Sequence, residues 1–271
     1  MRKSLLTLGL LAATSAPVMA ADYSDGDIHK NDYKFLQFNL MGAFNELPRS
    51  SDTGHDYLEM EFGGRSGIFD LYGYVDVFNL TSNPGSDKDG ADKIFMKFAP
   101  RMSLDAITGK DLSFGPVQEL YLSTLFEWDG NNGGVNTQKV GLGSDVMVPW
   151  FGKMGLNLYG TYDSNQKDWN GFQISTNWFK PFYFFENGSF ISYQGYIDYQ
   201  FGMKDEYSQV SNGGAMFNGI YWHSDRFAVG YGLKLYHDVY GFEDGTGLPW
   251  DSSTKSESSG VGHYVAVTYK F

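Results

Sequence analysis

The sequence contains no cysteine and only eight prolines among its 271 residues. Without cysteine the fold has no disulfide, and no thiolate is available to bind a metal ion. After Ala20 there is also no uninterrupted apolar run of the roughly 20 residues that a membrane-spanning helix needs. Lys and Arg number 20 against 32 Asp and Glu, which argues against a nucleic-acid polymer or an anionic lipid surface as the main partner.

The first twenty residues, 1–20, have the three parts of a secretory signal peptide. Arg2 and Lys3 are basic, an apolar stretch follows, and Val18-Met-Ala20 is a small-residue cleavage site. We expect cleavage after Ala20, which leaves a single domain over residues 21–271. Its first part, residues 21–32, is polar, and we expect it to lie in the periplasm.

The last ten residues, 262–271, alternate strictly between two unlike faces, as a β-strand does. Val265, Val267, Tyr269 and Phe271 point one way, and the even-numbered residues point the other way. A soluble protein would expose this apolar edge to water, whereas an outer-membrane barrel pairs its last strand with its first and turns the apolar face to lipid. The 17% aromatic residues and 34 glycines also fit such a barrel.

The same alternation recurs about twelve times and predicts an all-β, transmembrane, antiparallel up-and-down barrel. The predicted strands span residues 33–44, 55–62, 68–78, 93–104, 117–128, 137–148, 153–162, 169–179, 189–202, 213–222, 226–239 and 262–271. Compact connections alternate with longer polar ones, which predicts short periplasmic turns and longer extracellular loops. Residues 105–115 and 180–188 fall on the short-turn side although neither is short. A soluble β-sandwich or lipocalin-like barrel would also alternate, but it would bury the apolar face.

The stretch Phe69-Asp-Leu-Tyr-Gly-Tyr-Val-Asp76, within segment 61–76, resembles that of the Tsx-type nucleoside-specific channels of the outer membrane. The subgroup called outer membrane protein K is more similar still, over nearly the whole mature chain, including residues 38–44, 179–188 and 222–226. The resemblance implies a twelve-stranded monomeric barrel in the outer membrane of a Gram-negative bacterium. It further implies a narrow nucleoside-selective pore, with the external loops serving as a bacteriophage receptor.

A barrel of about twelve strands lies between small filled barrels and open porins, so a constricted pore is expected. A nucleoside is neutral, with a flat base that stacks on aromatic rings and sugar hydroxyls that carboxylates and amides such as Gln37 and Asn39 accept. Shared parity on consecutive strands predicts a lumen lined by Phe35, Asp70, Tyr72, Tyr74, Asp76, Lys97, Arg101, Glu119 and Tyr121. The alternative stays open that these charges only fill the barrel and neutralise one another, while the tyrosines form an interfacial girdle.

Nothing in the sequence indicates an enzyme, and we expect no catalytic residue, metal or cofactor. No Gly-x-Ser-x-Gly or His-Glu-x-x-His motif is present. The pairs His55-Asp56 and His237-Asp238 are adjacent only along the chain, which sends their side chains to opposite faces of a strand. The alternatives to a channel are a surface receptor, a structural barrel without specific transport, or an outer-membrane hydrolase.

The expected partners are nucleosides or similar small solutes, outer-membrane lipid, and the barrel assembly machinery through Tyr269–Phe271. A bacteriophage is expected to bind through the extracellular loops. Loop residues 163–168 and 243–250 are aromatic or acidic, and Trp250 is the first of them that we would probe. External loops are often only solvated, however, so these loops carry no stronger prediction.

Overall fold

A computed structural model describes residues 22–48, 54–91, 93–129, 134–248 and 251–271. The predicted signal peptide with its cleavage site after Ala20, and Trp250, lie outside these described residues. Within the described ranges no helix has the length and apolar character needed to cross a membrane.

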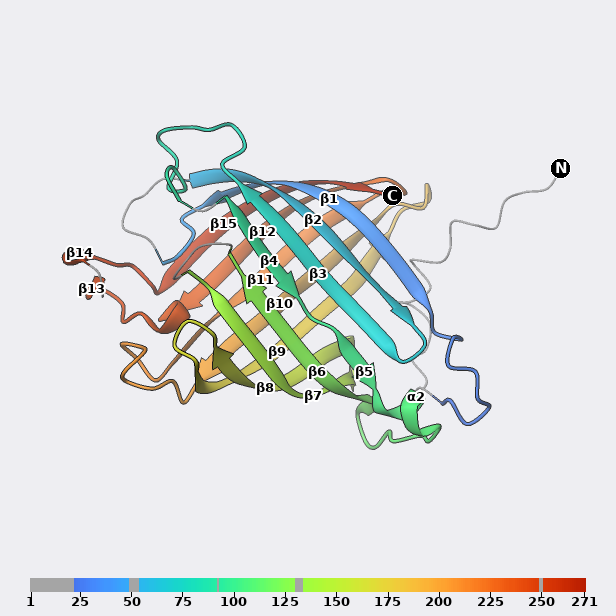
Figure 1. Cartoon of the computed structure of the whole chain (residues 1–271). Helices are drawn as coiled ribbons and strands as arrows, with labels where there is room; N and C mark the ends of the chain where they lie inside the picture. Colours follow the sequence, from blue (N-terminus) through green and yellow to red (C-terminus); the bar gives the residue numbers. More distant parts are fainter. Residues whose placement is uncertain (1–21, 49–53, 92, 130–133, 249–250) are drawn as a thin grey trace.

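The described residues form one closed antiparallel barrel of twelve strands, one of which is split into two pieces (Figure 1). The strands are β1 (Tyr33–Phe44), β2 (Gly54–Ser66), β3 (Phe69–Phe78), β4 (Ile94–Phe98), β5 (Arg101–Ser103), β6 (Val117–Trp128), β7 (Asn136–Val148), β8 (Gly152–Asp163), β9 (Asp168–Phe184), β10 (Phe190–Phe201), β11 (Asn212–His223), β12 (Phe227–His237) and β15 (Gly260–Lys270). Closure is made by β1 and β15, with Phe38 opposite Tyr269 and Gly42 opposite Val265. The predicted pairing of the last strand with the first is therefore confirmed.

The fourth strand was predicted to be continuous over residues 93–104, and this prediction is wrong. β4 and β5 are separated at Ala99-Pro100, although both pieces pair with β3 and with β6. Pro100 has no N–H to donate, so the ladder is interrupted there, while its carbonyl accepts hydrogen bonds from the Thr124 N–H at 3.0 Å and Oγ1 at 2.8 Å. The strand also ends before Leu104, because Ser103 caps the short helix α2 (Leu104–Thr108).

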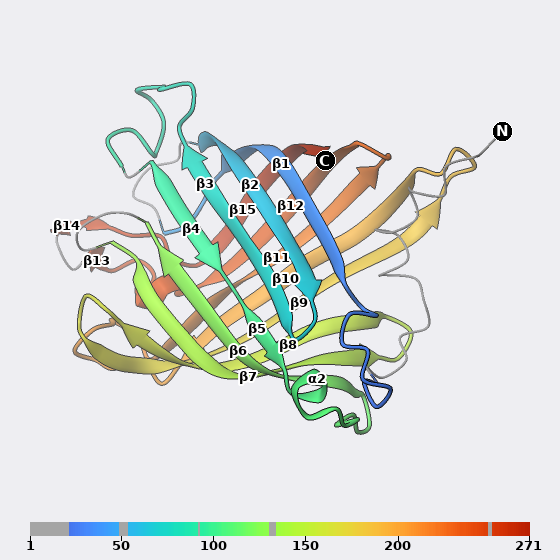
Figure 2. The same ribbon diagram turned by 45° about the vertical axis from the view of Figure 1, so that its right-hand side comes forward.

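Strand β9 is longer than predicted, ending at Phe184 rather than Phe179. Pro181, which lies in the predicted connection 180–188, stands opposite Ser192 beside a register shift, where the ladder is already irregular. The β9–β10 hairpin projects beyond its neighbours (Figure 2) and leaves Phe182 and Phe184 exposed. The connection placed at 180–188 is therefore a short turn over residues 185–189.

Apolar side chains face outward and polar ones are enclosed, as the sequence predicted. On the outside, Leu142 and Val267 are 65% and 52% exposed. On the inside, Ser123 and Thr268 are fully buried or nearly so. A surface of this kind is stable only against hydrocarbon, because in water it would present a continuous apolar belt.

The two ends of the barrel differ. β1 begins and β15 ends at the end where most connections are tight turns, here called the short-turn end. The opposite, long-loop end carries the connections after β3, β10 and β12, and the last of these contains η1 (Val239–Gly241) and a small hairpin of β13 (Gly247–Leu248) with β14 (Asp251–Lys255). Two connections depart from the pattern: residues 104–116 at the short-turn end hold α2, and residues 164–167 at the long-loop end form only a tight turn.

The candidate solute pathway

A cavity of about 1550 Å³ runs through the barrel. Its lining extends from Asp22 and Asn31 at the short-turn end to Glu46 and Lys88 at the long-loop end. All nine residues predicted from strand parity line it: Phe35, Asp70, Tyr72, Tyr74, Asp76, Lys97, Arg101, Glu119 and Tyr121. Contact of any of them with a solute stays a prediction.

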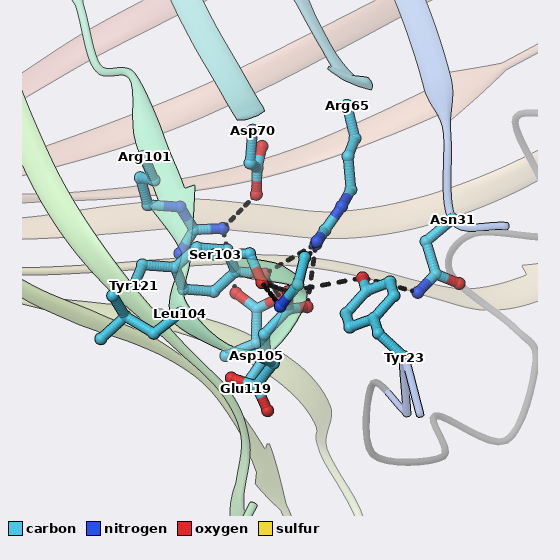
Figure 3. Close-up of polar contacts among 12 residues, drawn as sticks. Tyr23, Asn31, Arg65, Asp70, Arg101, Ser103, Leu104, Asp105, Glu119 and Tyr121 are labelled. Carbon is cyan, nitrogen blue, oxygen red and sulfur yellow. Dashed lines mark hydrogen bonds and ion pairs between the residues drawn. The ribbon is translucent and has the colours of Figure 1, made fainter. Parts of the chain in front are cut away.

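An ion pair with two contacts joins Arg65 and Glu119 near the short-turn end (Figure 3). Arg65 Nη1 and Nη2 donate to Glu119 Oε2 and Oε1 at 2.8 and 2.6 Å, and Ser103 Oγ donates to the same carboxylate. Both side chains are about 95% buried. Parallel contacts of this kind are the strongest form of ion pair, so Glu119 is held by the protein itself.

Arg101 organises a second group of charges beside this pair. Its Nη2 donates to Asp70 Oδ2 at 2.5 Å and to Asp145 Oδ1 at 3.1 Å, and its guanidinium lies 4.0 Å from the centroid of the Tyr121 ring. The Tyr121 hydroxyl donates to Asp145 Oδ2 at 3.1 Å, and Lys153 Nζ lies 2.5 Å from the same oxygen. At this end the predicted residues largely satisfy one another, which favours the space-filling interpretation here.

The polar segment before β1 covers part of the short-turn end. Tyr23 is only 1% exposed; its hydroxyl donates to Glu119 Oε1 at 3.4 Å and accepts from Asn31 Nδ2 at 2.9 Å. Burial raises the pKa of Tyr23 to about 12, so the phenol stays protonated at neutral pH. The segment is fixed to the β2–β3 turn by Asp32, whose Oδ1 accepts from the Gly67 N–H at 2.8 Å.

Gly67 is required by this contact. Its φ of 56° is left-handed, and a Cβ at this position would lie 3.1 Å from Ile28 Cδ1. The segment before β1 therefore packs closely on the turn rather than passing it at a distance.

An ion pair crosses the middle of the lumen. Lys97 Nζ on β4 lies 2.8 Å from Asp198 Oδ2 on β10, and 3.5 Å from Glu127 Oε1 on the neighbouring strand β6. Asp198 also accepts from Ser175 Oγ at 2.6 Å. Glu127 is paired in addition with Lys139. Four charges from opposite walls are thus joined in one network.

Three carboxylates on β2 and β3, the acidic face, have no such partner. These are Glu59, Glu61 and Asp76, and no Lys or Arg nitrogen of the described residues lies within 4.0 Å of them. Asn39 Nδ2 donates to Glu59 at 2.5 Å, and the Tyr72 hydroxyl donates to Glu61 at 3.0 Å. Neutral donors hold the acidic face in place without neutralising it, so it remains an acceptor surface within the cavity.

Lys234 is the counterpart of the acidic face. Within the described part of the chain its Nζ has no carboxylate within 4.0 Å, but lies 5.1, 5.9 and 6.0 Å from the ring centroids of Tyr236, Tyr264 and Tyr196. Its cross-strand neighbour Phe217 stacks with Tyr196 at 5.9 Å. This lysine–tyrosine site offers an ammonium donor beside aromatic surface.

Phe35, Tyr72 and Tyr74 complete the predicted set. The Phe35 ring packs on Gly63, where an added Cβ would lie 2.5 Å from Phe35 Cε1. Tyr72 and Tyr74 meet edge to face at 6.3 Å. The structure adds residues that the prediction missed, among them Arg65 and Asp145. Both follow the inward parity of their strands. Arg65 lies beyond the predicted end of its strand at residue 62, whereas Asp145 lies within its predicted strand and was not selected.

The histidine pairs that adjacency suggested do not form an acid–base site. His55 Nδ1 lies 2.9 Å from Asp87 Oδ1, on the connection after β3, rather than beside Asp56. His237 Nδ1 lies 4.0 Å from Asp238 and its side chain is exposed. No group of three or more His, Asp or Glu side chains in the described ranges is placed to hold a metal ion.

Comparison with known proteins supports a channel. Residues 30–271 match the family model of the nucleoside-specific channel-forming protein, Tsx. The chain is 79% identical to the outer membrane protein OmpK of Vibrio parahaemolyticus and 28% identical to the nucleoside-specific channel-forming protein Tsx of Salmonella typhimurium, with all of each chain covered. The solved NanC porin shares the fold, with a TM-score of 0.51 at 7% identity over 86% of this chain and all of the other. The chain therefore belongs to the Tsx family of nucleoside-specific channel-forming proteins, and it is a channel of the bacterial outer membrane.

Proposed function

We propose that this barrel is a narrow diffusion channel for nucleosides. The observation that carries the proposal is the presence, within one cavity, of an acidic face and a lysine–tyrosine site. Among the described residues, no Lys or Arg nitrogen lies within 4.0 Å of the first and no carboxylate lies within 4.0 Å of the second. The match to the Tsx family and the name of the Salmonella relative support nucleosides as the solute.

The chemistry of a nucleoside fits these two surfaces. The sugar presents hydroxyl donors, which Glu59, Glu61 and Asp76 are able to accept. The base presents ring nitrogens and carbonyls as acceptors, to which Lys234 is able to donate, and a flat face for Tyr196. The hydroxyls of Tyr74 and Tyr196 also have no hydrogen-bond partner among the described residues. A neutral solute with both kinds of group therefore finds partners on both walls.

Transport also requires that no contact be too strong, because a single deep site would trap the solute. The strongest charges of the lumen, Arg65, Arg101 and Lys97, are already bound to carboxylates of the protein. The acidic face and the lysine–tyrosine site lie at different places along the wall, which favours several weak contacts with the solute. Closure of β1 on β15 leaves the barrel without a free edge, which supports a monomer.

Liposome swelling tests the proposal. Vesicles containing the protein should swell faster in adenosine than in a sugar of similar size, because only the nucleoside engages both surfaces. Equal rates for the two solutes would refute nucleoside selectivity and leave a general pore.

Two further partners are proposed, one for the carboxy-terminal residues and one for the long-loop end of the barrel. The segment Tyr269–Phe271 lies at the end of the closing strand, and the ring centroids of Tyr269 and Phe271 are 5.0 Å apart. We propose that the barrel assembly machinery binds this aromatic segment. The long-loop end, where β13 and β14 stand out from the barrel (Figure 1), is proposed as the bacteriophage attachment site. Adsorption that survives deletion of residues 241–260 would exclude that loop.

A further inference from the structure

The ion pair between Lys97 and Asp198 spans the lumen rather than following the wall. Between β4 and β10 the sheet order places β6, β7, β8 and β9, and the two strands lie on opposite walls (Figure 1). The 2.8 Å contact between Lys97 Nζ and Asp198 Oδ2 is therefore a crossbar through the solute pathway. A solute that travels the length of the cavity has to pass it.

Each end of the crossbar has a second partner on its own wall. Lys97 Nζ lies 3.5 Å from Glu127 Oε1 on the adjacent strand, and Asp198 Oδ1 accepts from Ser175 Oγ at 2.6 Å on the adjacent strand. If the crossbar opens, the ammonium retains a carboxylate and the carboxylate retains a hydroxyl. Breaking a buried pair is costly mainly because it leaves one charge without a partner. Here Lys97 keeps a carboxylate and Asp198 keeps a hydrogen-bond donor, which lowers that cost.

We propose that the Lys97–Asp198 crossbar is an openable constriction that selects the solute. A solute passes readily only if it replaces both contacts, accepting a hydrogen bond from Lys97 while donating one to Asp198. The Tyr196 ring, 5.9 Å from Lys97 Nζ, provides an aromatic surface at the same level. The selected class is a neutral polar molecule with a flat ring and neighbouring donor and acceptor groups. This solute class rests on the proposed function, whereas the opening of the crossbar does not.

Single-channel conductance in KCl tests the opening without any nucleoside. Lys97→Met and Asp198→Leu each remove the crossbar while roughly keeping the size of the side chain. Both should raise the open conductance roughly twofold or more, because the narrowest section limits the current. The double variant should give no further increase, since the crossbar is already broken in each single variant.

A simple effect of fixed charge predicts a different result. Removing a cation and removing an anion from the lumen should then change the conductance in opposite directions, whereas loss of the crossbar raises it in both variants. Opposite changes, or a double variant that equals the product of the singles, would overturn the crossbar. Asp168→Asn, in the Lys204–Asp168 pair outside the cavity lining, is the control and should leave the conductance unchanged.

Ser175→Ala gives an independent test, because it keeps the crossbar and removes the second partner of Asp198. Opening should become harder, with longer closed times than in the original protein. Unchanged closed times would contradict the proposal. Barrel formation in each variant is checked by the heat-dependent shift in electrophoretic mobility that folded barrels show.

Block of the KCl current by adenosine tests the solute class. Asp198→Asn should weaken the block by several-fold, because the amide no longer accepts sugar or amine donors with a full charge. If conductance behaves as expected but adenosine blocks neither protein, the crossbar stands and the nucleoside assignment fails. Equal block of both proteins would refute selection by the crossbar.

Discussion

Arg65 and Glu119 form an ion pair between strands that are not neighbours, with guanidinium–carboxylate contacts of 2.6 and 2.8 Å. β2 and β6 are separated in the sheet by β3 and the split strand, so this pair ties two distant parts of the wall together. Around it lie Ser103, Tyr121 and Tyr23, each hydrogen-bonded to one of the two partners (Figure 3). The short-turn end is thus held by one buried polar network.

Loss of Arg65 should be among the most destabilising single changes in the lumen. Arg65→Met leaves the Glu119 carboxylate buried without its cation, a situation that typically costs about 3–5 kcal/mol. The free energy of unfolding in urea, measured in lipid vesicles, should fall by that order. Arg65→Met with Glu119→Gln should recover part of the loss. Arg226→Met, at an exposed arginine, is the control, and a decrease as large as that of Arg65→Met would contradict the account.

Removing the ammonium of Lys234 should weaken nucleoside binding. Lys234→Met deletes a donor that has no carboxylate within 4.0 Å in the part of the chain that the structure describes, so the barrel should keep its stability. A hydrogen bond from a charged group to a ligand in a wet channel contributes about 1 kcal/mol, or roughly a fivefold change in the adenosine concentration for half block. Lys167→Met, at an exposed turn, should not change the block. Unaltered block in Lys234→Met would exclude this residue from the solute pathway.

The acidic face should favour cations over anions in the pore. Glu61→Gln removes one negative charge while its amide oxygen still accepts from the Tyr72 hydroxyl. The reversal potential in a KCl gradient should therefore shift toward that of a less cation-selective channel. Glu243→Gln, exposed on a long loop, should give the original value. An identical reversal potential in Glu61→Gln and Glu243→Gln would show that the acidic face does not govern ion passage.

Tyr23 should hold the segment before β1 against the barrel. Tyr23→Ala removes the buried ring and its contacts with Glu119 and Asn31, so the segment should be released. Tryptic cleavage after Lys30 should become several-fold faster, since proteolysis follows the population of the open form. Tyr207→Ala is the matched control, because Tyr207 lies on the loop after β10 and its hydroxyl donates to Asp168. Equal cleavage rates would mean that Tyr23 does not anchor the segment.

The strands were predictable from the sequence because a lipid-facing barrel imposes alternation on every strand. The limits of β1 and β6 agree with the prediction, since neither strand contains a proline or two consecutive glycines. Two errors lie at Pro100 and Pro181, where the meaning of a proline depends on its partner across the ladder. A third lies at Gly63-Gly64, where β2 continues to Ser66 beyond the predicted end at residue 62. The alternation of polar and apolar residues along one strand does not reveal which residue lies opposite the proline.

The candidate site was predictable as a set of inward residues but not as a network. Parity placed Lys97 on an inward face, yet its contact with Asp198 depends on which strands stand opposite after closure. Tyr23 gave no signal at all, because it precedes the first strand and its burial comes from the tertiary path of an irregular segment. That Lys234 has no carboxylate within 4.0 Å among the described residues likewise follows only from the positions of the other charges.

The current through single channels in a planar bilayer, recorded while adenosine is added, tests the account most directly. We predict a small cation-preferring conductance that adenosine blocks reversibly, with a half-block concentration well below that of a similar-sized sugar. A conductance insensitive to adenosine, or blocked equally by the sugar, would contradict the assignment of this lumen to nucleosides.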